Sequence, residues 1–197
     1  LPNGTELKNR LLMAPMTTCT GYYDGTVTSE LVEYYRARSG SIGTIIVECC
    51  FVDDLGLAFP GAIGIDNDEK IAGLAKIAEA IKSKGSKALL QIYHGGRMVD
   101  PKLIGGRTPV GPSAVAAPRD GAATPVALTT EEVEGMIGKF GEAVRRAIQA
   151  GFDGVEIHGA NTYLIQQFYS PNSNQRDDEW GGSRDNRARF PLAVLDI

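Results

Sequence analysis

Short apolar runs alternate with longer amphipathic stretches along this chain of 197 residues. Runs with the continuous apolar character of buried strands cover residues 11–14, 44–48, 87–92 and 151–158. Between these runs, apolar positions recur every three or four residues, which predicts amphipathic helices. A chain that alternates strand and helix in this way is typical of parallel strands joined by right-handed crossovers. The pattern therefore predicts an α/β fold.

Polar residues mark where the predicted helices begin. Thr28 has the sequence context of a helix N-cap, and Thr129-x-x-Glu132 is a capping box. Residues 66–69 form another capping-box pattern, and a last helix is predicted after residues 183–186. An Asn3-Gly4 turn signal predicts a small hairpin within residues 1–10. Residues 98–128 lack periodicity, and a connection this long is more often a functional loop or lid than a linker.

Chemistry-bearing residues stand at the carboxyl ends of the predicted strands, where parallel α/β folds place their active sites. Gln91 lies at the end of the third strand, while His158, Asn161 and Tyr163 follow the fourth. Because these last three side chains differ in acid–base character and share one short connection, we expect them to converge on a single small ligand. Glu48 and Glu156, at strand tips, are interpreted as structural ion-pair partners.

Composition and charge narrow the class of protein. The formal net charge of −4 comes from interspersed acidic and basic residues, so we expect no nucleic-acid or membrane partner. No apolar run approaches the ~20 residues of a membrane span, and residues 1–4 lack signal-peptide character, which predicts a cytoplasmic protein. Cys19, Cys49 and Cys50 lack Cys-x-x-Cys spacing, so we expect reduced thiols and no metal site.

Four motifs together resemble the old yellow enzyme family of FMN-dependent NAD(P)H oxidoreductases. They are Leu12-Met13-Ala14-Pro15-Met16-Thr17, Gln91-x-x-His94-x-Gly96-Arg97, His158-x-x-Asn161-x-Tyr163 and Asp178-Glu179-x-Gly181-Gly182-Ser183-x-x-Asn186-Arg187-x-Arg189-Phe190. The resemblance implies a (β/α)₈ TIM-type barrel after a short N-terminal hairpin. Since the chain has about four βα units, we expect residues 1–197 to be the N-terminal half of a single flavin-binding barrel, with the remaining half as a partner.

The resemblance also implies which residues meet the flavin. Pro15, Met16 and Thr17 would line the isoalloxazine of FMN, with Thr17 donating to its O4 atom. Cys49 would lie beside the ring after the second strand, and Gln91 would bond the pyrimidine edge. Fixed donors suit a flavin because negative charge arrives on the ring when it is reduced.

By the same resemblance, His158 and Asn161 would hold a substrate carbonyl oxygen over the ring. The resemblance also implies that His158 contacts the cofactor. The implied reaction passes hydride from NAD(P)H through flavin N5 to an enone-type alkene. Tyr163 would deliver the proton to the other alkene carbon, because a phenol with a pKa of about 10 stays protonated at neutral pH.

Alternatives remain open at this point. A different flavin barrel of the superfamily, such as a dienoyl-CoA reductase or an amine dehydrogenase, would carry further domains. A half-barrel could instead be a catalytically silent scaffold. The family's flavin phosphate site and the cation near flavin N1 belong to the second half of the barrel, and neither is found in this sequence. The sequence also leaves open a homo-oligomer and the choice between NADH and NADPH.

Overall fold

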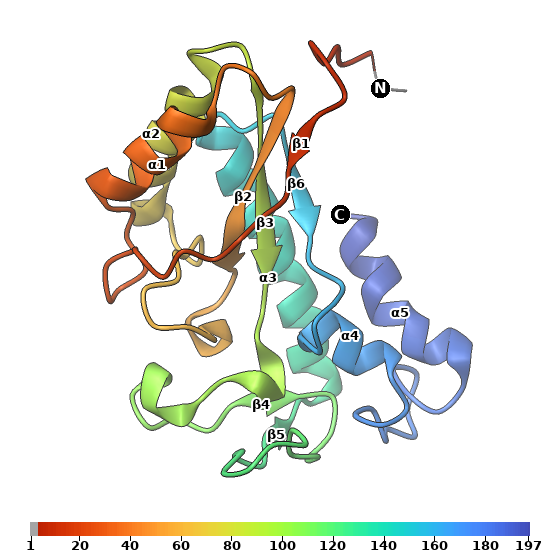
Figure 1. Ribbon diagram of the computed structural model, residues 1–197. Helices are drawn as coiled ribbons and strands as arrows, with labels where there is room; N and C mark the ends of the chain where they lie inside the picture. The colour runs from red at the N-terminus through yellow and green to blue at the C-terminus, as the bar shows by residue number, and fades with distance from the viewer. Residues whose placement is uncertain (1–3) are drawn as a thin grey trace. The chain divides into compact units, whose positions relative to one another are not determined.

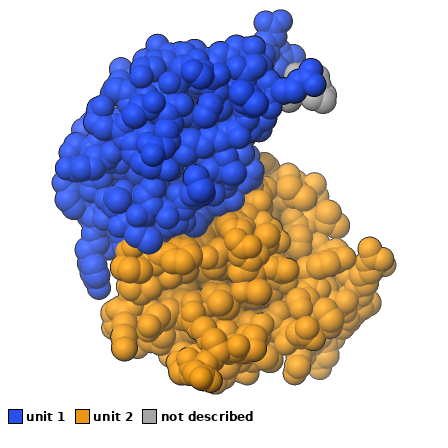
Figure 2. Space-filling view, in the orientation of Figure 1, with its two compact units in different colours: residues 1–50, 61–92, 143–156 blue, residues 51–60, 93–142, 157–197 orange. Residues whose placement is uncertain are grey.

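The computed structural model describes residues 4–197 and divides into two compact units (Figure 2). Unit 1 comprises Leu1–Cys50, Gly61–Ile92 and Ala143–Glu156. Unit 2 comprises Phe51–Pro60, Tyr93–Glu142 and Ile157–Ile197. Each unit has its own buried core.

Unit 1 is built on a sheet in the order β1-β2-β3-β6, whose strands are labelled in Figure 1. The strands are β1 (Leu12–Met13), β2 (Thr44–Phe51), β3 (Lys87–Tyr93) and β6 (Gly154–Ile157). β1 and β2 are parallel, with Leu12 opposite Thr44. All of β2 is buried, which explains why its sequence is mostly apolar and does not alternate with polar residues. The predicted parallel α/β class is confirmed.

Two helices of unit 1 pack against each other, α1 (Ser29–Arg38) and α2 (Ile71–Lys82) (Figure 1). α1 begins as predicted, since the Thr28 hydroxyl accepts from the Leu31 N–H. A 3₁₀ turn, η2 (Asp68–Lys70), precedes α2 and is capped by the Asn67 side chain. Fully buried Ile and Leu side chains of α2 and the sheet form the core: Ile45, Leu74, Ile77, Ile81 and Leu90.

The predicted N-terminal hairpin is only partly within the described residues, because Asn3 lies outside them. Residues 4–10 form bends and no strand. Side-chain bonds hold this segment instead: Asn9 Nδ2 donates to the Ser41 carbonyl (2.8 Å), and Lys8 Nζ contacts the Gly40 carbonyl. Leu11, at the start of the sheet, is bonded through its carbonyl to Gly43 and Thr44.

Unit 2 contains short elements and loops that the pattern of apolar residues did not resolve. They are η1 (Asp54–Gly56), η3 (Gly96–Met98), η4 (Pro101–Ile104), β4 (Val110–Gly111), β5 (Val126–Ala127) and α4 (Leu164–Tyr169). β4 and β5 are parallel, so the predicted structureless segment 98–128 is partly ordered by its own strand pair. α5 (Arg184–Leu195) packs on α4, with the rings of Phe168 and Phe190 stacked at 4.1 Å.

The longest helix, α3 (Thr130–Gln149), begins at the predicted capping box. The Thr129 hydroxyl accepts from the Glu132 N–H (3.2 Å), and the Glu132 carboxylate accepts from the Thr129 N–H (2.7 Å). α5 begins in the same way, since the Ser183 hydroxyl accepts from the Asn186 N–H. Within residues 4–197, every helix is too short or too polar to span a bilayer.

Candidate active site

The segment that follows β1 carries the first group of predicted site residues. The Thr17 hydroxyl lies 3.2 Å from Cys49 Sγ, at the carboxyl end of β2. Pro15 is half-buried and the Met16 side chain is 58% exposed, so both leave apolar surface uncovered within unit 1. Burial raises the pKa of the Cys49 thiol to about 11, so the thiol stays protonated at neutral pH. Cys49 can therefore pack and hydrogen-bond but is no thiolate nucleophile.

The buried carboxyl of Glu48 holds the segment that follows β1. Glu48 is fully buried, and its Oε1 accepts from the Thr18 N–H (3.2 Å) and the Thr18 hydroxyl (3.3 Å). Its Oε2 accepts from the Tyr35 hydroxyl (3.2 Å), which in turn accepts from the Glu48 N–H (2.9 Å). Burial raises the pKa of the Glu48 carboxyl, although these donors oppose the shift. Glu48 thus joins the loop after β1 to both β2 and α1.

Gln91 and Glu156 lie on the neighbouring strands β3 and β6. The Gln91 side chain is buried, and its Nε2 donates to Glu156 Oε1 over 2.7 Å. Among residues 4–197, no ion pair includes Glu48 or Glu156. Within the described residues, hydrogen-bond donors from neighbouring segments contact both carboxylates, and their role as ion-pair partners stays a prediction.

In unit 2, His158 and Tyr163 form an aromatic pair. Their ring centroids lie 4.9 Å apart with planes at 81°, and both side chains are buried. His158 Nδ1 accepts from the Ala160 N–H (3.3 Å). Since a neutral imidazole has one donor and one acceptor nitrogen, this bond assigns the proton to Nε2. His158 is thus set to donate through Nε2.

Tyr93, which the sequence interpretation did not single out, supports this pair. Its ring centroid lies 5.2 Å from that of Tyr163 and 6.4 Å from that of His158. The Tyr93 side chain is fully buried, and its hydroxyl accepts from the Ala58 N–H (3.1 Å). Its place between Gln91 and His94 in the second motif is the one sequence signal that could have identified it.

Asn161 lies on a turn with a left-handed backbone. Its φ is 54°, and that of Thr162 is 61°, a conformation that a β-branched residue adopts at a cost. Two glutamines of α4 hold the turn: Gln166 Oε1 accepts from the Thr162 N–H, and Gln167 Nε2 donates to the Thr162 carbonyl. Asn161 itself is exposed, so its side chain is available to a ligand.

His94 and Arg97 have scaffolding contacts. His94 Nδ1 accepts from the Gly96 N–H (3.0 Å), and burial lowers the pKa of this imidazole to about 3, so it stays neutral. Arg97 Nη1 donates to the carbonyls of Val115 (3.2 Å) and Ala116 (3.1 Å), which fixes part of the 98–128 segment.

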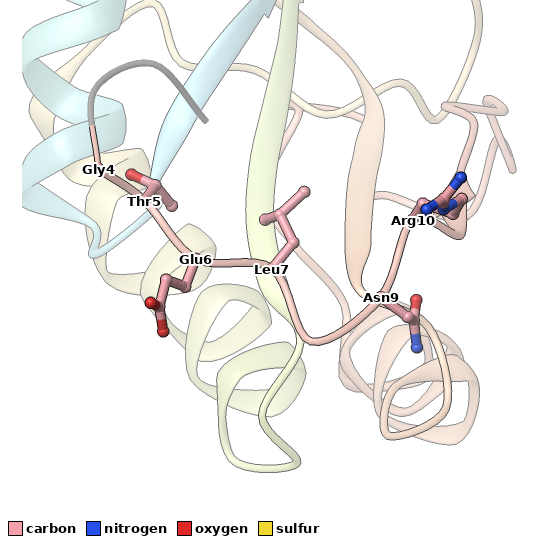
Figure 3. A pocket seen from close by; sticks show the side chains of 6 residues that line it. All are labelled: Gly4, Thr5, Glu6, Leu7, Asn9 and Arg10. Carbon is pink, nitrogen blue, oxygen red and sulfur yellow. The ribbon is translucent and has the colours of Figure 1, made fainter.

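Two larger hollows are not lined by the predicted site residues. An open hollow beside the N-terminal segment is lined by residues such as Glu6, Leu7 and Arg10, and Figure 3 shows their side chains spread along the chain without converging. An apolar groove of about 400 Å³ lies in unit 2 along α4 and α5 and includes Tyr169 and Leu192. Within residues 4–197, no cluster of His, Cys, Asp or Glu could hold a metal ion.

Each unit therefore brings part of the predicted set together. In unit 1, Thr17 meets Cys49, and Gln91 is fixed by Glu156. In unit 2, His158 meets Tyr163, with Asn161 on the turn between them in sequence. The sequence did not identify the supporting contacts made by Tyr35, Tyr93 and the two carboxylates Glu48 and Glu156.

Known proteins resemble the whole of this chain. The NADH:flavin oxidoreductase / NADH oxidase family matches residues 2–197. The chain is 90% identical over 197 residues to the NADH:fumarate oxidoreductase of Klebsiella pneumoniae (strain 342), covering 100% of this chain and 21% of that protein. It is 62% identical over 193 residues to the NADH:acrylate oxidoreductase of Vibrio harveyi, covering 98% of this chain and 19% of that protein. The chain thus spans about a fifth of the length of these relatives.

A solved structure agrees with the family match. Morphinone reductase superposes with a TM-score of 0.91 and 36% sequence identity, covering 98% of this chain and 55% of that one. The parallel strands of this chain thus align with the N-terminal half of a barrel of the old yellow enzyme type. The family uses flavin and NADH, as the motifs predicted. The chain belongs to the NADH:flavin oxidoreductase / NADH oxidase family, the old yellow enzyme family.

Proposed function

We propose that this chain is the N-terminal half of a single barrel that binds FMN, accepts hydride from NADH and reduces an activated alkene. The observation that carries the proposal is the His158–Tyr163 pair, in which an imidazole whose Nδ1 accepts from a backbone N–H packs edge-to-face against a buried phenol. A hydrogen-bond donor and a proton donor from one short segment are what conjugate reduction needs around one substrate.

The residues of unit 1 fit a flavin ring. Thr17 offers a hydroxyl beside Cys49, Gln91 offers an amide whose orientation is fixed, and Pro15 and Met16 offer apolar surface for a planar ring. Bound FMN would carry hydride from NADH to the alkene. Thr17 and Gln91 would hold the O4 atom and the pyrimidine edge of the ring.

The substrate would be held by its oxygen. We assign His158 Nε2–H and the Asn161 amide as donors to the carbonyl or carboxylate oxygen conjugated to the double bond. These bonds draw electron density from the alkene, so its β-carbon becomes the hydride acceptor. The Tyr163 hydroxyl gives its proton to the α-carbon and is then reprotonated from solvent.

The names of the relatives support the choice of reductant and substrate class. Both are described as NADH oxidoreductases, and fumarate and acrylate are both α,β-unsaturated carboxylates. We therefore propose NADH as the reductant and a small unsaturated carboxylate or ketone as the substrate.

A second function is favoured by the lengths of the relatives. The chain covers 55% of morphinone reductase but only 21% of the fumarate-linked relative, so more than half of that relative lies beyond a barrel. In a longer protein of that kind, the barrel could oxidise NADH and pass electrons to a second redox group. The alkene would then be reduced elsewhere.

Single-turnover kinetics of Tyr163→Phe in the full-length, FMN-loaded protein test the proposal. Without the phenol proton, reoxidation of the NADH-reduced flavin by an unsaturated carboxylate or ketone should slow by about 10²-fold or more. Reduction of the flavin by NADH should stay within a few-fold of wild type. The control is Tyr169→Phe, the same change at an exposed position of α4.

The two candidate functions give different results in this experiment. If the alkene is reduced at the barrel flavin, Tyr163→Phe slows only the oxidative half-reaction. If the barrel only oxidises NADH, Tyr163→Phe and Tyr169→Phe reoxidise equally fast. Equal loss of both half-reactions in Tyr163→Phe alone would refute the proton-donor role.

A further inference from the structure

The bond between Gln91 and Glu156 determines which way the Gln91 amide faces. The two side chains meet across neighbouring strands, with Gln91 Nε2 and Glu156 Oε1 2.7 Å apart. Gln91 is 9% exposed, so little water reaches its amide to replace Glu156 as a partner. Within residues 4–197, Glu156 makes no ion pair, and its carboxylate accepts from this amide.

The chemistry of the pair allows only one orientation. An ionised carboxylate only accepts hydrogen bonds, whereas an amide carries a donor on nitrogen and an acceptor on oxygen. The Gln91 NH₂ group must therefore face Glu156, and its carbonyl oxygen must point away from Glu156 within the amide plane. An isolated glutamine could turn over and offer either atom to a ligand.

We propose that Glu156 is a positioning residue that makes Gln91 present an acceptor, Oε1, to the bound cofactor. This inference rests on the proposed function, since it takes the ligand of Gln91 to be the flavin. The pyrimidine edge of a flavin has two carbonyl acceptors with one N–H donor, N3, between them, so the oriented Gln91 oxygen selects N3–H. Glu156 thereby determines which atom of the pyrimidine edge faces Gln91.

A second consequence concerns the redox potential. The negative charge of Glu156 lies one hydrogen bond behind the residue that contacts the ring edge. Because reduction adds electron density to that edge, a nearby carboxylate disfavours the reduced form. Glu156 should therefore hold the flavin potential below the value that a neutral residue would allow.

The test measures FMN affinity by fluorescence quenching and the midpoint potential by reductive titration in the full-length protein. Glu156→Gln removes the charge and lets the Gln91 amide turn over. FMN should bind roughly three- to tenfold more weakly, as expected for one hydrogen bond. The midpoint potential should shift to a more positive value. Neither readout depends on turnover.

A matched control and a variant with the two residues exchanged distinguish a loss of Gln91 orientation from a general loss of stability. Asp153→Asn removes a carboxylate that bonds the Ala88 N–H and Lys87 just before β6. It should lower the melting temperature but leave the potential unchanged. The double variant Gln91→Glu, Glu156→Gln keeps an amide–carboxylate pair and again presents an acceptor oxygen. FMN affinity should recover towards wild type, with a potential below that of the single variant.

The possible outcomes separate the two proposals. Wild-type protein that binds no FMN refutes the proposed function itself. Wild-type protein that binds FMN, together with Glu156→Gln of unchanged affinity and potential, overturns the positioning role alone. A double variant that binds no better than Glu156→Gln would also overturn it, because the polarity argument requires recovery.

Discussion

The Tyr35→Phe substitution tests whether the buried Glu48 network holds the loop after β1. It removes one hydroxyl that both donates to Glu48 Oε2 and accepts from the Glu48 N–H. Tyr35 is 1% exposed, so water cannot easily replace the lost partner. A buried group without a partner costs about 1–3 kcal/mol, and a charged one costs more. With two groups affected, unfolding free energy should fall by about 2–5 kcal/mol.

The pH dependence of this loss follows from the raised pKa of Glu48. The unfolded carboxyl titrates near ~4.3. Burial raises the native pKa above that value, so across the window between them the native state binds more protons and stability falls as pH rises. Loss of the Tyr35 donor raises the pKa of Glu48 further. The Tyr35→Phe deficit should therefore be larger at neutral pH than near pH ~5.

Urea unfolding at both pH values and hydrogen exchange of the β2 amides measure the effect. Tyr34→Phe is the matched control, because Tyr34 is half-buried and its hydroxyl makes no hydrogen bond within residues 4–197. It should change stability by no more than about 0.5 kcal/mol. The Glu48 amide should exchange faster only in Tyr35→Phe. Two variants that behave alike at neutral pH would refute the reasoning.

Two further predictions concern packing and thiol reactivity. Gly96→Ala should destabilise unit 2 by roughly 1–3 kcal/mol in thermal melting, because the φ of Gly96 is +57° and a Cβ there would lie 2.2 Å from Gln167 Oε1. The control is Gly135→Ala in α3, which should not destabilise the protein because the space around Gly135 is open. Alkylation followed by mass spectrometry should label exposed Cys19 well before Cys49, whose burial raises its pKa to about 11; equal rates would contradict this.

The features that sequence predicted well are those set by local chemistry. The Thr28 cap and the Thr129–Glu132 capping box lie where the sequence placed them, because capping needs only residues within one turn. The apolar run within β2 was also recognisable, since a fully buried strand has no exposed face that requires alternating polar residues. Each motif of the candidate site likewise occupies one short continuous segment, although the roles of its residues stay predictions.

The features that sequence missed depend on distant partners. α4 has six residues, too few to be stable alone, and is held by Leu164 N–H bonding to the His94 carbonyl and by Phe168 stacking on Phe190. β4 and β5 are two residues each and pair across an irregular segment. The donors that contact Glu48 and Glu156 were missed for the same reason, because a carboxylate on a strand gives no local sign of a distant donor.

A structure of the full-length protein with FMN bound tests the central claim most directly. The account predicts Thr17 and Gln91 at the edge of the isoalloxazine, with Gln91 Oε1 facing N3–H and with His158 and Tyr163 over the face of the same ring. A flavin bound elsewhere in the protein, with Gln91 and Tyr163 on separate surfaces, would contradict it.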